Sequence, residues 1–352
     1  MIGKNIRYLR LQKDVTMSRL ASLSGIRVAK ISDYESGKQK PDIDTIKKLS
    51  NALGATVSDL LSIRNEKVTY SHEQFRKGCN LSKTTQEYVR QSAEEYIGRF
   101  YTVVEILETD VMPAVPAIHS IPLKDDSEDC AKLMRGWLGL PKSGAAVNLV
   151  GLLENSGIIV CECDIQSSRF SGMNGLANGR PYVVYNKNMS AERIRSTVAH
   201  ELAHIVFDWG SCAQSQAENK ATAISGAFLL PKEDVQRKLI LQKDAIDISE
   251  HGVCYSVCCE YGVSMCLLAK RASICGVITP QAETSFYKIA NRLGWRVKEP
   301  ERVQKERPAL FDNLVFRAVK EGRISVQKGA ELLQQPYMYV ERSCFAPDAA
   351  GC

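Results

Sequence analysis

The sequence predicts a mainly α-helical protein with a small β-sheet, which is an α+β fold. Three observations lead to this expectation. Residues 1–65 have the pattern of five short helices, apolar residues recur at helical spacing in several later segments, and only residues 158–163 and 182–185 read as strands. The chain has 352 residues, which is long enough for two or three globular domains. Its composition, 44% hydrophobic and 24% charged residues, is that of an ordinary globular protein.

Residues 1–65 begin the chain with a compact set of helices. Thr16 is a favourable N-cap for the second helix, and Gly25 ends that helix. Ile31 and Tyr34 of the third helix should face the core. A tight turn at Gly25 joins the second helix to the third, which is the arrangement of a helix-turn-helix unit. The expected helices cover residues 2–14, 17–24, 26–36, 43–53 and 57–61.

The distribution of charge sets this segment apart. Residues 1–65 contain twelve basic and six acidic residues, which accounts for the net charge of +6 of the whole chain. The remaining 34 basic and 34 acidic residues balance each other. A basic excess confined to one small helical segment indicates a nucleic-acid-binding surface.

The same segment resembles the repressor-type (XRE) helix-turn-helix family of phage repressors. The resemblance implies that the helix over residues 26–36 enters the major groove of double-stranded DNA. Met17 stands where many family members have a glutamine that contacts phosphate. The matching positions are Leu20-Ala21, Gly25-Ile26, Ile31-Ser32, Tyr34-Glu35, Gly37-Lys38, Pro41 and Leu49 through Leu53-Gly54. The residues expected to face bases or phosphates are Arg27, Val28, Ala29, Lys30 and Asp33, and those expected to meet the DNA backbone are Lys38 and Lys40.

Residues 66–125 read as a helical linker region. One amphipathic helix is expected over residues 86–106, and Pro113, Pro116 and Pro122 then interrupt the chain. We assign no chemistry to this region. Its expected role is to connect the segments on either side of it and to cover their surfaces.

A helix that begins near Ser190 carries a metal-binding pattern. His200 and His204 are four residues apart, so both imidazoles lie on one face of the helix and can reach one ion. Glu201 lies beside that face, where it can take a proton from a metal-bound water without being a ligand. The His-Glu-x-x-His pattern therefore predicts a zinc centre with a general base.

A catalytic zinc site needs a third protein ligand and leaves the fourth position to water. Spacing leaves four candidates. Asp208 follows one helical turn after the second histidine, Asp234 comes after a proline break, and His251 lies in a polar turn. Glu218 begins a later run of apolar residues with helical spacing, so a second, antiparallel helix could bring it opposite the histidines.

The stretch over residues 193–204, followed by residues 218–231, resembles the ImmA/IrrE family of zinc metallopeptidases. The resemblance implies a zincin-like domain over residues 126–275. Two departures, Ser196 in place of an aromatic residue and Ala203 in place of glycine, change packing and remove no ligand. The site residues carried over from the family motifs are His200, His204 and Glu218 as Zn²⁺ ligands and Glu201 as the general base.

The chemistry implied is peptide hydrolysis by a zinc-activated water. Bound zinc lowers the pKa of its water towards neutrality and polarises the scissile carbonyl, while Glu201 accepts the proton. An oxyanion donor is also expected. Tyr182, Tyr185 and Arg195 are eligible, and the choice among them stays open.

Residues 276–352 read as a helical C-terminal region. Helices are expected over residues 308–321 and 325–333, and the tail after Pro336 is expected to be loosely ordered. Just before this region, residues 253–272 read as one helix. The twelve cysteines of the chain are expected to be reduced, because a secretory signal is lacking.

These patterns and resemblances predict a cytoplasmic DNA-binding regulator with a zinc endopeptidase that cleaves itself or a partner repressor, in a phage, mobile-element or stress-response circuit. The expected partners are an operator in double-stranded DNA, a protein substrate and a second copy of the chain in a homodimer. No membrane association is expected, because no apolar run approaches about 18 residues. The alternative is a transcription factor or antitoxin whose metallopeptidase-like domain acts as a non-catalytic sensor.

Overall fold

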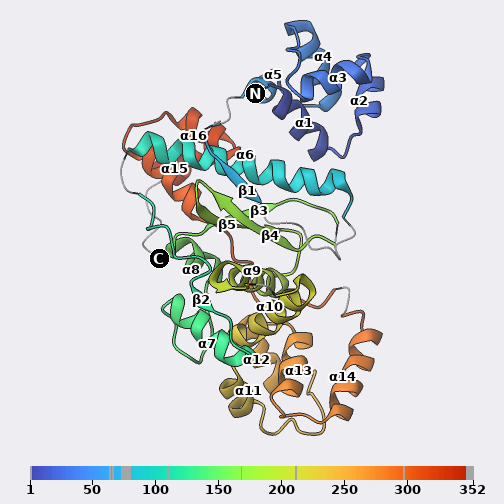
Figure 1. Ribbon diagram of the computed structural model, residues 1–352, viewed down its shortest axis with the longest axis vertical. Coiled ribbons are helices and arrows are strands. Elements are labelled where there is room, and N and C mark those ends of the chain that lie inside the picture. Colours follow the sequence, from blue (N-terminus) through green and yellow to red (C-terminus); the bar gives the residue numbers. More distant parts are fainter. Residues whose placement is uncertain are drawn as a thin grey trace. The chain divides into compact units, whose positions relative to one another are not determined.

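The computed structural model describes residues 2–62, 65, 67–72, 81–108, 111–167, 169–210, 212–295 and 298–345. The chain forms two compact units, shown in Figure 1. The first comprises Met1–Thr109 with Leu314–Cys352, and the second comprises Asp110–Asn313. Helices predominate among the described residues and the strands are short, which confirms the predicted α+β class.

Five short helices open the first unit, as the sequence predicts. The side chain of Thr16 caps the second of them by accepting a hydrogen bond from the N–H of Arg19. The third begins at Val28 rather than at residue 26, because Arg27 is extended and takes the N-cap position. The helices are α1 (Ile2–Gln12), α2 (Met17–Ser24), α3 (Val28–Glu35), α4 (Ile43–Leu53) and α5 (Val57–Leu61). Their shared core consists of Ile6, Leu20, Ile31, Tyr34, Ile46, Leu49, Leu53 and Leu60.

A buried ion pair joins α1 to α3. Arg10 donates from Nε and Nη2 to the two carboxylate oxygens of Glu35, at 2.6 and 2.8 Å. Its Nη1 donates to the carbonyl of Val15 at 3.0 Å. A guanidinium held on both edges allows little rotation, so this pair fixes the orientation of α3 against α1.

The first unit also brings the linker region and the C-terminal region together. Arg99 donates to the carbonyl of Leu332, and Gln334 donates to the carboxylate of Glu95 at 3.0 Å. These contacts join helices that are more than 200 residues apart in the chain. The elements are β1 (Tyr70–His72), α6 (Lys83–Leu107), α15 (Leu310–Lys320), which enters this unit at Leu314, α16 (Val326–Leu333) and α17 (Tyr337–Phe345).

The helix α17 corrects the expectation of a loosely ordered tail after Pro336. Residues 337–345 are helical, and Val340 and Cys344 on one face of the helix are buried. The cause is tertiary, since α17 packs against α16 and its apolar face would otherwise be open to water. Residues 346–352 lie outside the described residues.

In the second unit, the strand β5 (Arg180–Asn186) pairs in parallel with β3 (Ile159–Cys163) and antiparallel with β4 (Gly172–Ala177). The turn between β4 and β5 has positive φ at both Asn178 and Gly179, 50° and 76°, which suits a two-residue hairpin turn. The sequence pattern does not predict β4, because glycine and asparagine have low strand propensity. The Asn-Gly pair is the signal that could have revealed it.

The helices of the second unit cover this sheet and pack on one another. The helix α9 lies against β4 and β5, and α10 runs beside α9 (Figure 1). A second, two-stranded parallel sheet joins β2 to β6. The remaining elements are β2 (Ile121–Pro122), α7 (Ser127–Trp137), α8 (Leu149–Asn155), α9 (Ala191–Val206), β6 (Phe207–Asp208), α10 (Gln214–Leu229), α11 (Lys232–Lys238), α12 (Val253–Tyr261), α13 (Met265–Ile274) and α14 (Pro280–Arg292).

The expected single helix over residues 253–272 is wrong, because α12 ends at Tyr261 and α13 starts anew at Met265. The carbonyl oxygens of Tyr261 and Gly262 accept hydrogen bonds from Arg195, and Ser264 caps α13. Within the described residues, no single helix is long and apolar enough to cross a membrane, although α12 and α13 taken together would pass that test across a bend of 103°.

All ten cysteines in the described part of the chain are free thiols. Burial raises the pKa of Cys254 to about 11 and the pKa of Cys161 well above its usual value. Such thiols stay protonated near neutral pH and pack as small apolar groups, which agrees with the expectation of reduced cysteines.

Candidate metal centre

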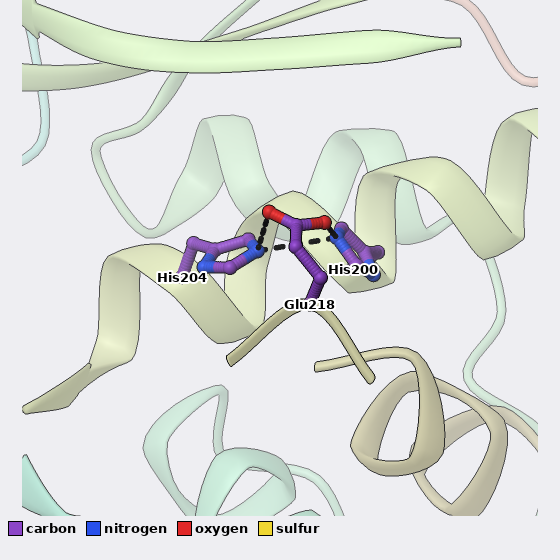
Figure 2. A group of neighbouring side chains, drawn as sticks. All are labelled: His200, His204 and Glu218. Atoms are coloured by element: carbon purple, nitrogen blue, oxygen red, sulfur yellow. Dashed lines mark hydrogen bonds and ion pairs between the residues drawn. The ribbon is translucent and has the colours of Figure 1, made fainter. Parts of the chain in front are cut away.

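Two helices of the second unit bring the candidate ligands together. The helix α9 begins after its N-cap Ser190, whose Oγ accepts a hydrogen bond from the N–H of Arg193 at 3.3 Å. His200 and His204 are one helical turn apart and project from the same face of α9. Glu218 comes from the first half of α10, and Figure 2 shows its carboxylate beside both imidazoles.

The three side chains direct donor atoms towards a common point. Nε2 of His200 lies 3.1 Å from Nε2 of His204, and the nearest oxygens of Glu218 lie 3.3 and 3.5 Å from these two nitrogens. Ligands bound to one tetrahedral zinc at about 2.0–2.1 Å are about 3.3 Å from one another. Two imidazoles and a carboxylate, with a fourth position left for water, are also a usual ligand set of catalytic zinc. The residues present therefore fit Zn²⁺.

A further contact determines which nitrogen of His200 faces this point. Thr222 donates its hydroxyl proton to the carbonyl of Glu218 at 2.9 Å, and its Oγ1 lies 3.4 Å from Nδ1 of His200. Because the single hydroxyl proton is already donated, Oγ1 can only accept from an Nδ1–H. Nε2 of His200 then carries the lone pair that a metal requires.

An aromatic side chain restricts the second imidazole. The rings of His204 and Trp209 have centroids 5.0 Å apart and are tilted by 39°. Trp209 follows directly after β6, which pairs with β2 and so has a defined position. The orientation of His204 therefore depends on the chain immediately after α9.

The other three candidates for the third ligand lie elsewhere. The helix α9 ends before Asp208, which is exposed in β6. Asp234 is buried and forms an ion pair with Arg237 at 2.6 Å. His251 precedes α12, with its ring centroid 6.2 Å from that of Tyr255. Among the described residues, none of these three belongs to the group of converging donor atoms in Figure 2.

Glu201 follows His200 directly but makes its contact with the sheet. The residue is 7% exposed, and its Oε2 accepts a hydrogen bond from Nδ2 of Asn174 in β4 at 2.8 Å. Glu201 does not belong to the converging group of donor atoms. The Glu201 carboxylate therefore follows a candidate ligand in the chain and lies outside the converging group. The sequence pattern does not identify Asn174, because it does not predict the strand β4. The Asn178-Gly179 pair, which is typical of a hairpin turn, is the signal that could have revealed this strand.

Two of the three eligible oxyanion donors are committed to the core of the second unit. The guanidinium of Arg195 forms an ion pair with Glu306 and donates to the carbonyls of three other residues. The hydroxyl of Tyr185 lies 3.3 Å from the carbonyl oxygen of Glu306, and burial raises the pKa of Tyr185 above its usual value. Tyr182 is fully buried. Arg195 and Tyr185 therefore serve to hold elements together.

The residues expected to face DNA lie at the N-cap of α3, on α3 and after it, in the first unit. Asp33 is half-buried, and its carbonyl accepts hydrogen bonds from Ser36 and Gln39. Val28 is 42% exposed although it is apolar. The exposed members of the set are Arg27, Val28, Ala29, Lys30, Lys38 and Lys40.

Comparison with known families assigns both segments. A helix-turn-helix family model matches residues 6–60, and the IrrE N-terminal-like domain model, of the peptidase M78 type, matches residues 153–273. The chain thus combines a segment that matches an XRE-type helix-turn-helix model with a segment that matches an IrrE/ImmA-like model of the peptidase M78 type.

Two relatives are regulators from Bacillus subtilis (strain 168). The SPbeta prophage-derived HTH-type transcriptional regulator YonR is 38% identical over 61 residues, which cover 17% of this chain and 56% of YonR. The HTH-type transcriptional repressor RghR is 33% identical over 89 residues, which cover 24% of this chain and 66% of RghR. The chain thus spans little more than half the length of the first relative.

Proposed function

We propose that this protein is a DNA-binding transcriptional regulator with a zinc-dependent endopeptidase domain that cleaves itself or a partner repressor. The enzymatic half rests on one observation, the convergence of donor atoms from His200, His204 and Glu218. The proposal includes a role in a phage, mobile-element or stress-response circuit, which the similarity to a prophage-derived regulator supports.

The DNA-binding half is supported by charge, exposure and similarity. Residues 1–65 carry the whole net positive charge of the chain, and α3 exposes Lys30 with Arg27 at its N-cap. The two Bacillus subtilis relatives are named as an HTH-type transcriptional regulator and an HTH-type transcriptional repressor. The proposed partner is an operator in double-stranded DNA in the cytoplasm, bound by a homodimer whose half-sites lie about one helical turn apart.

The proposed hydrolysis assigns a part to each side chain. Zn²⁺ held by His200, His204 and Glu218 would polarise the scissile carbonyl and acidify a water molecule. Glu201 accepts a proton from that water as the water oxygen bonds to the carbonyl carbon. The proton then passes to the amide nitrogen as the C–N bond breaks. The products are a carboxylic acid and an amine, which become a carboxylate and an ammonium group when the acid proton moves to the amine.

The test is a search for discrete cleavage products. The purified full-length protein is incubated with Zn²⁺, alone and with each protein encoded by the adjacent genes, and fragments are identified by mass spectrometry. We expect cleavage at one or a few positions, absent from Glu201→Gln and from samples treated with a chelator. Zinc binding without cleavage of any of these proteins would contradict the peptidase and favour a metal-binding sensor.

A further inference from the structure

The strand β4 approaches α9 more closely than a side chain at Gly172 would permit. A Cβ atom at this position would lie 2.5 Å from Cγ2 of Thr197 and 3.3 Å from Oε1 of Glu201. Alternate residues of a strand point to the same side, so Asn174 faces α9 as Gly172 does. The close approach brings the Asn174 amide within 2.8 Å of the Glu201 carboxylate.

The hydrogen bond between these two side chains has a defined direction. Asn174 is 8% exposed and Glu201 is 7% exposed, so little water competes for the contact. An ionised carboxylate only accepts hydrogen bonds, so the amide must present Nδ2 and not Oδ1. Among the described residues, Oε2 of Glu201 has this one partner and Oε1 has none.

We propose that Asn174 is the positioning residue for Glu201: it anchors Oε2 against β4 and leaves Oε1 to accept the proton of the reacting water. This inference rests on the proposed peptidase function. A neutral amide suits the task, because an arginine or lysine would pair with the negative charge that makes Glu201 a base. A carboxylate held by one oxygen cannot rotate freely, so the proton acceptor is already aligned before substrate binds.

The experiment uses a metal-bound probe, because the peptide substrate is unidentified. Full-length protein is loaded with Co²⁺, whose visible absorption reports the site, and is titrated with acetohydroxamic acid. The acid binds metal through two oxygens after losing its hydroxamate proton, and Glu201 is the neighbouring group able to accept that proton. The affinity for the probe therefore measures how well Glu201 is placed, separately from peptide hydrolysis.

The key variant is Asn174→Leu, which keeps the approximate shape of asparagine but has no donor. We expect its Co²⁺ content to equal that of the wild type and its acetohydroxamate affinity to fall by about 10-fold or more. The acetohydroxamate affinity of Glu201→Gln should fall at least as far. Asn188→Ala is the matched control, since it removes an amide that donates to Asp164 at 2.8 Å and not to Glu201.

The outcomes separate the two proposals. Wild-type affinity in Asn174→Leu, with a loss in Glu201→Gln, would overturn the role of Asn174 and leave the metal site intact. A wild-type chain that binds no Co²⁺ would refute the metal site itself, and the positioning role with it.

A second measurement does not depend on metal. In the ¹⁵N spectrum of the metal-free protein, the Asn174 side-chain amide is identified by its absence from Asn174→Leu. We expect this signal to shift in Glu201→Gln and to stay in place in Asn188→Ala. An unshifted signal in Glu201→Gln would show that the two side chains are not bonded.

Discussion

Oγ1 of Thr222 lies 3.4 Å from Nδ1 of His200. Thr222 follows Glu218 by one helical turn on α10. The helix α10 therefore supplies both the carboxylate that faces the two imidazoles and the hydroxyl that orients one of them. Residues four apart on a helix share a face, which is why one element can do both. The position of α10 against α9 sets the geometry of the whole candidate centre.

Thr222 should thus support metal binding without touching the metal. Thr222→Val keeps the shape of the side chain but cannot accept from Nδ1 of His200. We expect its zinc affinity to fall by about 10- to 100-fold, as is typical when a contact behind a histidine ligand is removed. Thr222→Ser should stay close to the wild type. Competition with a chromophoric chelator measures the zinc affinity of each protein. Equal affinity in the wild type, Thr222→Val and Thr222→Ser would contradict this role.

The ligand assignment predicts one zinc ion per chain. Glu218→Ala should lose most of the metal, because two imidazoles alone hold zinc weakly. Asp208→Ala is the control, since Asp208 is an exposed carboxylate just beyond the end of α9. Elemental analysis of the purified proteins gives the zinc content. The assignment is wrong if Asp208→Ala strips the metal and Glu218→Ala retains it.

Glu201→Gln should separate metal binding from chemistry. The change preserves the size of the side chain and leaves His200, His204 and Glu218 in place, but removes the proton acceptor. We expect full zinc content and a loss of proteolysis of about 100-fold or more, which is the usual contribution of a general base. The rate of fragment formation checks this prediction, and unchanged cleavage would refute the mechanism.

Two substitutions should affect DNA binding differently. Arg27→Ala removes a side chain expected to reach base edges, so the preference for the operator over random DNA should fall by about 1–3 kcal/mol. Lys38→Ala removes a phosphate contact, so binding to both DNAs should weaken about equally and depend less on salt. Titrations at two salt concentrations with the protein's own promoter distinguish these effects. A full-length protein without sequence preference there would contradict the regulatory half of the proposal.

The buried pair of Arg10 and Glu35 should stabilise the helix-turn-helix part. Glu35→Leu leaves the guanidinium of Arg10 without its ionic partner among buried groups. We expect the free energy of unfolding of this part to fall by about 3–5 kcal/mol. The double variant Arg10→Met with Glu35→Leu should recover most of this loss, because no charge remains buried. Hydrogen exchange of peptides from residues 2–62, measured by mass spectrometry in the full-length protein, follows this part separately. Equal protection in Glu35→Leu and the wild type would contradict a stabilising pair.

Local patterns in the sequence were enough to predict the helix-turn-helix helices. Thr16 and Gly25 mark helix boundaries through contacts with the nearest residues, so their effect depends little on the rest of the fold. The same holds for His200 and His204, since a spacing of four residues places two side chains on one helix face in any context. These features depend on backbone geometry over a few residues.

Contacts between distant segments decided the rest. Spacing left Asp208 and Glu218 both eligible, and the end of α9 at Val206 together with the packing of α10 brought only Glu218 to the imidazoles. Asn174 came to lie beside Glu201 because β5 pairs with β4, a strand whose own residues have low strand propensity. Propensity and periodicity describe the secondary structure that a segment favours by itself. Burial against other segments determines where a helix or strand ends and which residues it contacts.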